Sequence, residues 1–201
     1  MMIDSFARAI LLLNSESVIW PFILIGLCFI DRLKFTHVLA ITLFALAYNP
    51  FLKSIFLIPL NPEIGKIGFS FPSGHTQIAV SCYGTVFILF KNKIMRATIV
   101  CLLMLIFWGM VHFRYHTWTD IIAGVGFTVL FQGLYFFILA KVEKSNDYIL
   151  HALMLIVCFL FILFIYYRAW IPDHMWFSVY GLSALTIIKF LFQKKKLGPD
   201  H

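Results

Sequence analysis

Two short polar segments carry most of the residues that could do chemistry. The first, FSFPSGHTQ (residues 69–77), puts Ser73, Gly74 and His75 directly after a proline that suits a helix start. A helix N-terminus offers unpaired backbone N–H groups and the positive end of the helix dipole, so it can bind an anion. Gly74 would let the anion approach the backbone, Ser73 would donate a hydroxyl and His75 a proton. A phosphate fits each feature. However, an ordinary Pro-Ser-Gly turn followed by an unrelated histidine would have the same sequence pattern.

The second polar segment is VHFRYHTWTDIIAG (residues 111–124). Thr117 and Asp120 have the spacing of a capping box that opens a helix. The segment also fits nucleophilic catalysis, with His116 as the nucleophile and Asp120 fixing its tautomer and stabilising the imidazolium. Attack on a phosphate would give a phosphohistidine, and His75 could protonate the leaving oxygen and then activate water.

A metal site is the alternative for the same segment. His112, His116 and Asp120 are spaced four apart and could share one face of a helix. The helix-start signal at Thr117 disfavours this arrangement, because it breaks the helix between His116 and Asp120. We therefore predict neither a metal nor another cofactor.

The composition indicates which elements must hold these residues. Of the 201 residues, 62% are hydrophobic and only 12% are charged, whereas soluble domains are about 45–50% apolar and about 25% charged. We expect an all-α, polytopic transmembrane helical bundle of about six to seven spans that forms one domain over residues 1–201. Residues 3–13 are predicted to form an interfacial amphipathic helix. The apolar runs predict spans at 18–30, 36–59, 75–90, 95–112, 121–140, 149–167 and 175–192.

Asn49-Pro50 interrupts the second apolar run. Because proline removes a helical hydrogen bond, the last turns of that run, which contain Lys53, are predicted to be kinked or separate.

The basic residues predict the orientation of the bundle. Seven spans place five Lys and Arg residues on the face that contains residues 60–74, 113–120 and 168–174, and eleven on the other face. The positive-inside rule puts the face with eleven in the cytoplasm. The net charge of +7 is then explained by topology and contact with membrane lipids, and we predict no nucleic-acid binding.

The FPSGH element, the His-x-x-x-Asp before an apolar helix and the upstream lysine together resemble the type 2 phosphatidic acid phosphatase superfamily. Its members are metal-independent integral membrane phosphatases with a helical-bundle core. They include lipid phosphate phosphatases, undecaprenyl diphosphate phosphatases and relatives of the vanadium haloperoxidases. The resemblance covers residues 53–124 and leaves the expected C-terminal spans, about 149–192, outside it.

The resemblance implies a role for each matching residue. His116 is the nucleophile, Asp120 its partner and His75 the general acid. The phosphate-binding residues are Lys53, Ser73 and Gly74.

Two positions depart from the family pattern. The first motif has an arginine where this chain has Leu60, followed by Asn61-Pro62, and the third has one where this chain has Met110. Each absent guanidinium would contribute about 1.5–3 kcal/mol to phosphate binding. Arg114, and more weakly Lys66, are candidate substitutes.

The expected function is that of a lipid phosphatase in the cell (inner) membrane. It would hydrolyse a lipid phosphate or isoprenyl diphosphate, such as undecaprenyl diphosphate, through a phosphohistidine on the extracytoplasmic face. The alternatives are a catalytically weak relative that binds or transports a lipid phosphate, and a lipid phosphotransferase.

Overall fold

The computed structural model describes residues 2–60, 68–142, 147–167 and 172–197, and most of them are helical. The prediction of an all-α bundle is confirmed. The α-helices are labelled α and two π-helical segments are labelled η. In chain order the elements are α1 (Met2–Leu12), α2 (Glu16–Ile25), η1 (Gly26–Ile30), α3 (Arg32–Phe56), α4 (Gly74–Ala79), η3 (Val80–Gly84), α5 (Thr85–Leu89), α6 (Lys93–His112), α7 (Trp118–Leu139), α8 (Asp147–Tyr166) and α9 (Asp173–Leu197).

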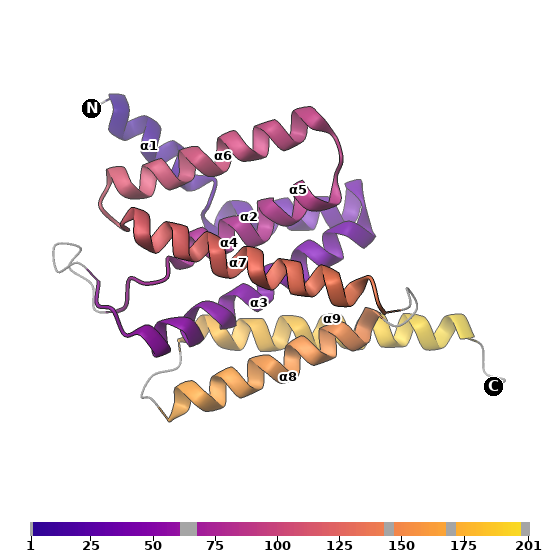
Figure 1. Ribbon diagram of the computed structural model, residues 1–201. Coiled ribbons are helices and arrows are strands. Elements are labelled where there is room, and N and C mark those ends of the chain that lie inside the picture. The colour runs from indigo at the N-terminus through magenta and orange to yellow at the C-terminus, as the bar shows by residue number, and fades with distance from the viewer. Residues whose placement is uncertain (1, 61–67, 143–146, 168–171, 198–201) are drawn as a thin grey trace.

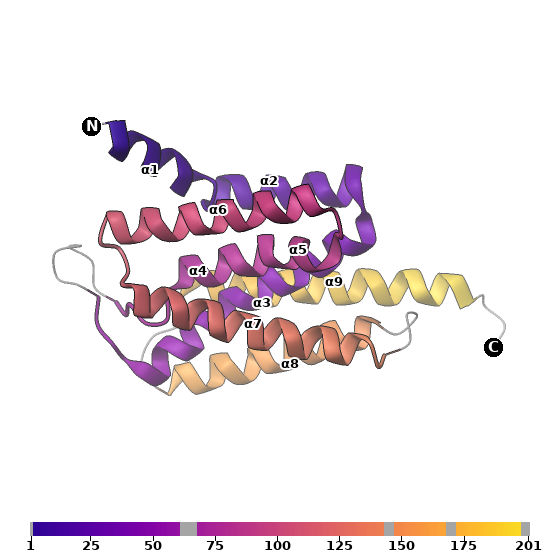
Figure 2. The same ribbon diagram turned by 45° about the horizontal axis from the view of Figure 1, so that its top comes forward.

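Most of the helices run roughly along one common direction (Figure 1). In Figure 1 α3 passes through the middle of the bundle, with α8 and α9 on one side and α2, α5 and α6 on the other. In Figure 2 α2 and α6 again lie on the opposite side of α3 from α8. α1 begins at the end of the bundle where α6 ends and α7 begins, and α9 ends at the opposite one.

Five of the described helices are long and apolar enough to cross a membrane: α3, α6, α7, α8 and α9. α1 and the α2–η1 helix pass the same test as one span bent by 45°, which gives up to six. The segment from α4 through η3 to α5 is also helical throughout. Its length is about 24 Å at 1.5 Å per residue, shorter than a hydrocarbon core of about 30 Å. The chain is therefore a multi-pass membrane protein, and the interfacial position of residues 3–13 stays a prediction.

Helix α3 does not break at Asn49-Pro50, so the prediction of a separate last segment is wrong, and the alternative of a kink stays a prediction. It continues as one helix to Phe56, and Leu57, with a left-handed φ of 53°, ends it. Proline is tolerated inside membrane helices when surrounding structure compensates for the lost hydrogen bond. α3 meets this condition because it is the most buried of the candidate spans.

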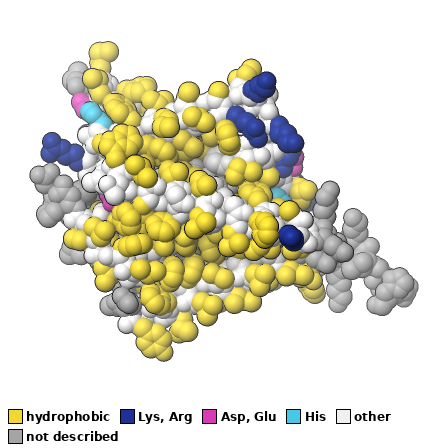
Figure 3. All heavy atoms as spheres, in the orientation of Figure 1, with side chains coloured by type: hydrophobic (Ala, Val, Ile, Leu, Met, Phe, Trp, Pro, Cys, Tyr) yellow, Lys and Arg dark blue, Asp and Glu magenta, His cyan; other side chains and the backbone are white. Residues whose placement is uncertain are grey.

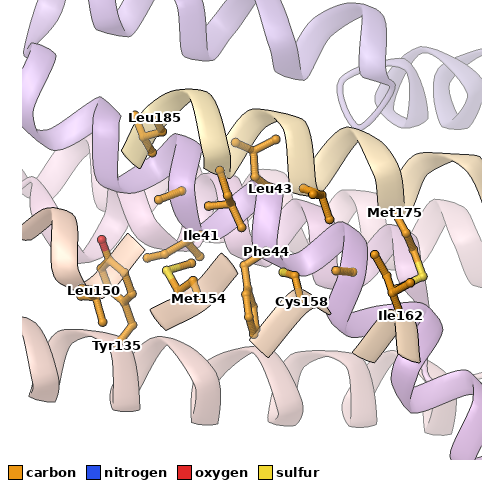
Figure 4. Close-up of a cluster of buried hydrophobic side chains, with 14 of the residues drawn as sticks. Ile41, Leu43, Phe44, Tyr135, Leu150, Met154, Cys158, Ile162, Met175 and Leu185 are labelled. Atoms are coloured by element: carbon orange, nitrogen blue, oxygen red, sulfur yellow. The ribbon is translucent and has the colours of Figure 1, made fainter. Parts of the chain in front are cut away.

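Two clusters of buried apolar side chains hold α3 in place. One joins it to α8, α9 and the end of α7, where Phe44, Met154 and Cys158 interdigitate (Figure 4). Phe44 also stacks on Phe131 with ring centroids 4.2 Å apart. The other cluster joins α3 to α2, α6 and the helix from α4 to α5. Packing on both sides fixes α3, and with it Lys53 near its end.

Apolar and basic side chains occupy different parts of the surface. Figure 3 shows hydrophobic side chains over the middle of this face and most of the visible Lys and Arg at one end. That end includes the α5–α6 connection, where Lys91, Lys93 and Arg96 lie. An apolar belt with charged ends is the surface expected of a membrane-embedded bundle.

Candidate active site

Three parts of the chain meet at the end of the bundle opposite the α5–α6 connection. His75 lies in the first turn of α4, His116 in the loop between α6 and α7, and Asp120 in the first turn of α7. The imidazole rings of His75 and His116 have centroids 6.0 Å apart. His116 Nδ1 lies 3.7 Å from Asp120 Oδ2. The structure therefore brings the three predicted catalytic residues together.

His116 is the most buried ring of this site, with 8% of its surface exposed. Within the described part of the chain its Nδ1 has no hydrogen-bond partner, because 3.7 Å to Asp120 is too long for one. Burial, and then the positive charges of His75 and Lys53, lower the pKa of His116 from 6.5 to about 4, although Asp120 acts in the opposite direction. His116 is therefore neutral near pH 7, and Lys53 is close enough for its charge to act on it.

Asp120 has a structural and an electrostatic role at once. Its Oδ2 accepts a hydrogen bond of 2.9 Å from the Thr117 backbone N–H, and its own N–H donates to Thr117 Oγ1 at 3.2 Å. The predicted capping box is thus confirmed. The same Oδ2 atom faces His116, so the box fixes the carboxylate beside the ring. The Asp120 carbonyl also accepts from the Ser73 N–H at 3.1 Å, which ties the PSGH turn to α7.

The Ser73 hydroxyl is used inside the turn. Ser73 is the N-cap of α4, and its fully buried Oγ accepts from the Thr76 N–H at 3.3 Å and from Thr76 Oγ1 at 3.0 Å. It also donates weakly to Met110 Sδ at 3.9 Å. Met110, which occupies the place of a motif arginine, is therefore a buried thioether packed against the turn.

Asn49 holds the PSGH turn against α3. Its Nδ2 donates to the Pro72 carbonyl at 3.1 Å and to Gln77 Oε1 at 2.7 Å. A Cβ added at Gly74 would lie 2.7 Å from Asn49 Oδ1, so only glycine fits there without a shift. Asn49 lies one helical turn before Lys53 on α3. Its hydrogen bonds therefore hold the PSGH turn against the part of α3 that carries that lysine. In the sequence Asn49 was interpreted only as part of an interruption, although a polar residue inside an apolar span is itself a sign of function.

Asn14 reaches the same turn from the α1–α2 link. Its side chain is buried, and its Nδ2 donates to the His75 carbonyl at 3.0 Å. Nearby, the Tyr83 hydroxyl donates to the Leu13 carbonyl. The N-terminal segment thus contacts the backbone of the candidate general acid, and no pattern in the sequence indicated this contact.

Arg114 is exposed on the α6–α7 loop, two residues before His116, with a left-handed φ of 55°. Its N–H donates to the Val111 carbonyl and the Tyr115 N–H donates to the Met110 carbonyl, both at 2.9 Å. These two bonds form a Schellman motif, whose left-handed position glycine usually occupies. The backbone conformation costs an arginine about 1–2 kcal/mol.

The alternative metal site does not form. His112 Nε2 lies 2.9 Å from Asp4 Oδ1, and its ring stacks on Trp108. Among the described residues, no group of three or more His, Cys, Asp and Glu side chains is arranged to hold a metal ion. Lys66, the other candidate substitute for an arginine, lies outside the described residues.

Comparisons with known proteins agree with this geometry at the level of the family. No curated protein and no solved structure matches the chain. The model of the PAP2 superfamily matches residues 34–144, which is more than half of the chain. The match confirms the resemblance seen in the motifs and covers Lys53, the PSGH turn, His116 and Asp120, whereas Asn14 lies outside it. The chain therefore belongs to the PAP2 superfamily and has its phosphatase-type fold.

Proposed function

We propose that the chain is an integral membrane lipid phosphatase that hydrolyses a lipid phosphate or an isoprenyl diphosphate through a phosphohistidine intermediate. The observation that carries the proposal is the arrangement around His116. This ring is neutral, lies 3.7 Å from the Asp120 carboxylate and is 6.0 Å, between centroids, from the more exposed ring of His75. A neutral nucleophile, an orienting carboxylate and a second proton carrier are the groups that two-step phosphoryl transfer needs. The whole chain would act as one domain around this site.

In the first step, Nε2 of His116 attacks the phosphorus, because Nδ1 faces Asp120 and carries the ring proton. The bond between phosphorus and its bridging oxygen breaks as the N–P bond forms; this oxygen leaves with the lipid in a monophosphate, and with the lipid monophosphate in a diphosphate. The leaving oxygen takes a proton from the His75 imidazolium. Asp120 stabilises the positive charge that develops on His116, and Lys53 attracts the non-bridging oxygens.

In the second step, His75 is neutral and accepts a proton from water. The water oxygen attacks the phosphorus, and the P–Nε2 bond breaks. Inorganic phosphate leaves, His116 returns to its neutral form and His75 is again protonated. The same ring thus acts first as an acid and then as a base.

Met110 favours a second candidate function. A thioether at the place of a motif arginine contributes no charge to a phosphate, and Leu60 contributes none at the other departing position. A relative that binds or transports a lipid phosphate while turning it over weakly would tolerate both losses. A lipid phosphotransferase would share the first step and replace water with another acceptor.

The test uses purified protein in lipid nanodiscs and a panel of lipid phosphates and isoprenyl diphosphates. We expect release of inorganic phosphate and an acid-labile phosphoryl group on His116 that His116→Ala lacks. Binding of lipid phosphate without release or labelling would support the non-hydrolytic candidate. Transfer of the phosphoryl group to an added lipid or sugar acceptor would support the phosphotransferase.

The site is proposed to face the extracytoplasmic side of the cell membrane. The asymmetry of five against eleven basic residues in the sequence supports this orientation. Tyr115 is an exposed position on the α6–α7 loop. Tyr115→Cys, in a background without the four native cysteines, should react with a membrane-impermeant thiol reagent on intact cells. Labelling only after lysis would reverse the orientation.

A further inference from the structure

An apolar groove of about 530 Å³ lies between the α4–α5 helix, α6 and α7. Gly84 and Ile88 line it on the first of these helices, Leu103 and Phe107 on α6, and Val125 and Gly133 on α7. Its surface is almost wholly carbon. Gln132, the polar residue of the lining, uses its Nε2 to donate to the Val80 carbonyl at 2.9 Å and to Thr85 Oγ1 at 3.0 Å.

The groove starts just beyond the candidate catalytic residues. Val80 follows His75 by five residues and Val125 follows Asp120 by five, so both lie about 7.5 Å further along their helices. From Val125 to Phe136 the lining extends about 16 Å along α7. The helices that bring the catalytic residues to one end of the bundle therefore also enclose the groove.

Two glycines leave the groove open. A Cβ at Gly133 would meet no atom within 4 Å, so the space beside it is empty. A Cβ at Gly84 would lie 3.3 Å from Val80 Cγ1 and 3.5 Å from Gln132 Nε2, so it would narrow the groove at its floor. Larger side chains at these positions would fill space that a slender apolar molecule can occupy.

We propose that this groove holds one hydrocarbon chain of the lipid whose phosphate occupies the His75–His116 site. The proposal rests on the proposed function and names the part of the substrate that the catalytic residues do not contact. Inside a bilayer the groove provides no hydrophobic gain, because the surrounding lipid is equally apolar. Its contribution is positional: a chain that lies along α7 keeps the attached phosphate beside His116, and small misplacements of a reacting group are costly.

The test fills the groove and compares two substrates. Gly133→Phe should lower kcat/KM for a long-chain lipid phosphate by about 10- to 100-fold, the effect of displacing a reacting group by about an ångström. Hydrolysis of a water-soluble, short-chain phosphate should change by less than a few-fold, because its chain does not reach Gly133. Gly126→Phe is the matched control, since a Cβ at Gly126 also meets nothing within 4 Å on the same helix but Gly126 does not line the groove.

Equal effects of Gly133→Phe on both substrates, or no effect on either, would overturn the proposal. Gly133→Leu fills less of the groove and should give an intermediate loss of kcat/KM for the long-chain substrate. It keeps the test valid if Gly133→Phe fails to fold. If the parent hydrolyses neither substrate, the proposed function fails, and the groove proposal is then tested by the binding of a lipid phosphate. A lipid phosphate with a photoreactive group at its chain end should then label α6 or α7 in the parent and in Gly126→Phe. Unchanged labelling in Gly133→Phe would refute the groove proposal.

Discussion

Two histidine clusters, each with at least one buried ring, lie at opposite ends of the bundle, and they differ in the charged groups beside them. At one end the Tyr135 hydroxyl lies 2.7 Å from His37 Nδ1 and 3.4 Å from His151 Nε2, so it links α3, α7 and α8 (Figure 4 shows Tyr135). At the other end His116 Nδ1 has no hydrogen-bond partner among the described residues and faces a carboxylate at 3.7 Å.

The contrast separates a structural role from a chemical one. A buried polar group that is hydrogen-bonded across helices stabilises the fold, whereas one that is left unsatisfied destabilises it. Histidine and burial are common to both clusters, so neither feature alone indicates catalysis. The Asp120 carboxylate and the positive charge of Lys53 beside His116 make the difference.

The largest expected difference comes from removing a histidine in each cluster. His116→Ala should reduce phosphate release by at least about 10⁴-fold, because no nucleophile remains. His151→Ala should leave turnover within a few-fold of the parent and lower the thermal stability of the protein in detergent. Similar losses of activity in both variants would remove the distinction between the clusters.

Asp120→Asn separates charge from capping. The amide oxygen can still accept from the Thr117 N–H, so the start of α7 should persist, while the imidazolium of His116 loses its stabilising carboxylate. We expect turnover to fall by about 10²–10⁴-fold with little change in melting temperature. Thr117→Ala is the converse control, which keeps the charge and should cost about 0.5–2 kcal/mol of stability. A drop in activity that follows stability in both variants would argue for a capping role alone.

Arg114→Gly tests whether this arginine replaces the missing guanidinium groups. Turnover should slow by about 10²–10³-fold if the side chain stabilises the transferring phosphoryl group. Stability should rise by up to about 1 kcal/mol, because glycine adopts the left-handed conformation without strain. Arg8→Ala is the matched control, since this second guanidinium lies 5.6 Å from the Phe113 ring on the same loop. Equal losses in the two variants would indicate a general effect of positive charge.

The pH dependence should also distinguish His116 from an ordinary histidine. Its pKa is lowered to about 4 in the folded chain, so the unfolded state binds the proton first and stability falls as the pH drops from about 6.5 towards 4. The acid limb of kcat/KM, which reports the free enzyme, should lie near 4. In Asp120→Asn this limb should move lower, because Asp120 raises the pKa of His116. Inflections shared by both proteins belong to groups other than His116, and a limb at 6.5 in the parent would contradict the assignment.

The smallest effect is expected at the hydrogen-bonded cluster. Tyr135→Phe removes the hydroxyl between His37 and His151 while keeping the ring. Interhelical hydrogen bonds in membranes contribute about 0.5–2 kcal/mol, so thermal unfolding in detergent should shift by a corresponding amount. Phosphate release should stay within a few-fold of the parent. A large loss of turnover would give this distant cluster a part in the reaction.

The sequence predicted most helices closely, because a bilayer requires long apolar runs that are visible in one dimension. Residues 95–112 were expected to be helical and Lys93–His112 are, and the capping box at Thr117 and Asp120 depends on local spacing alone. The continuation of α3 through Pro50 could not be predicted in the same way. It depends on the helices that pack around it, and these are distant in sequence.

The site was predicted in part for a similar reason. Motif spacing placed His75, His116 and Asp120 at helix ends that could meet on one face. The contacts of Asn14 and Asn49 depend on how α4 sits against two other segments, and hydropathy carries no information on that register. The direction of the Ser73 hydroxyl is likewise set by Thr76 and Met110 in three dimensions.

The close approach of Asn49 to Gly74 has a consequence for how relatives of this chain can diverge. With Oδ1 of Asn49 only 2.7 Å from the place of a Cβ at position 74, the two positions are epistatic. Alanine at position 74 requires the Asn49 side chain to shift or to be replaced by a smaller one, and either change disturbs its hydrogen bonds to the Pro72 carbonyl and Gln77. Substitutions at the three positions 49, 74 and 77 should therefore appear together in a library selected for folding.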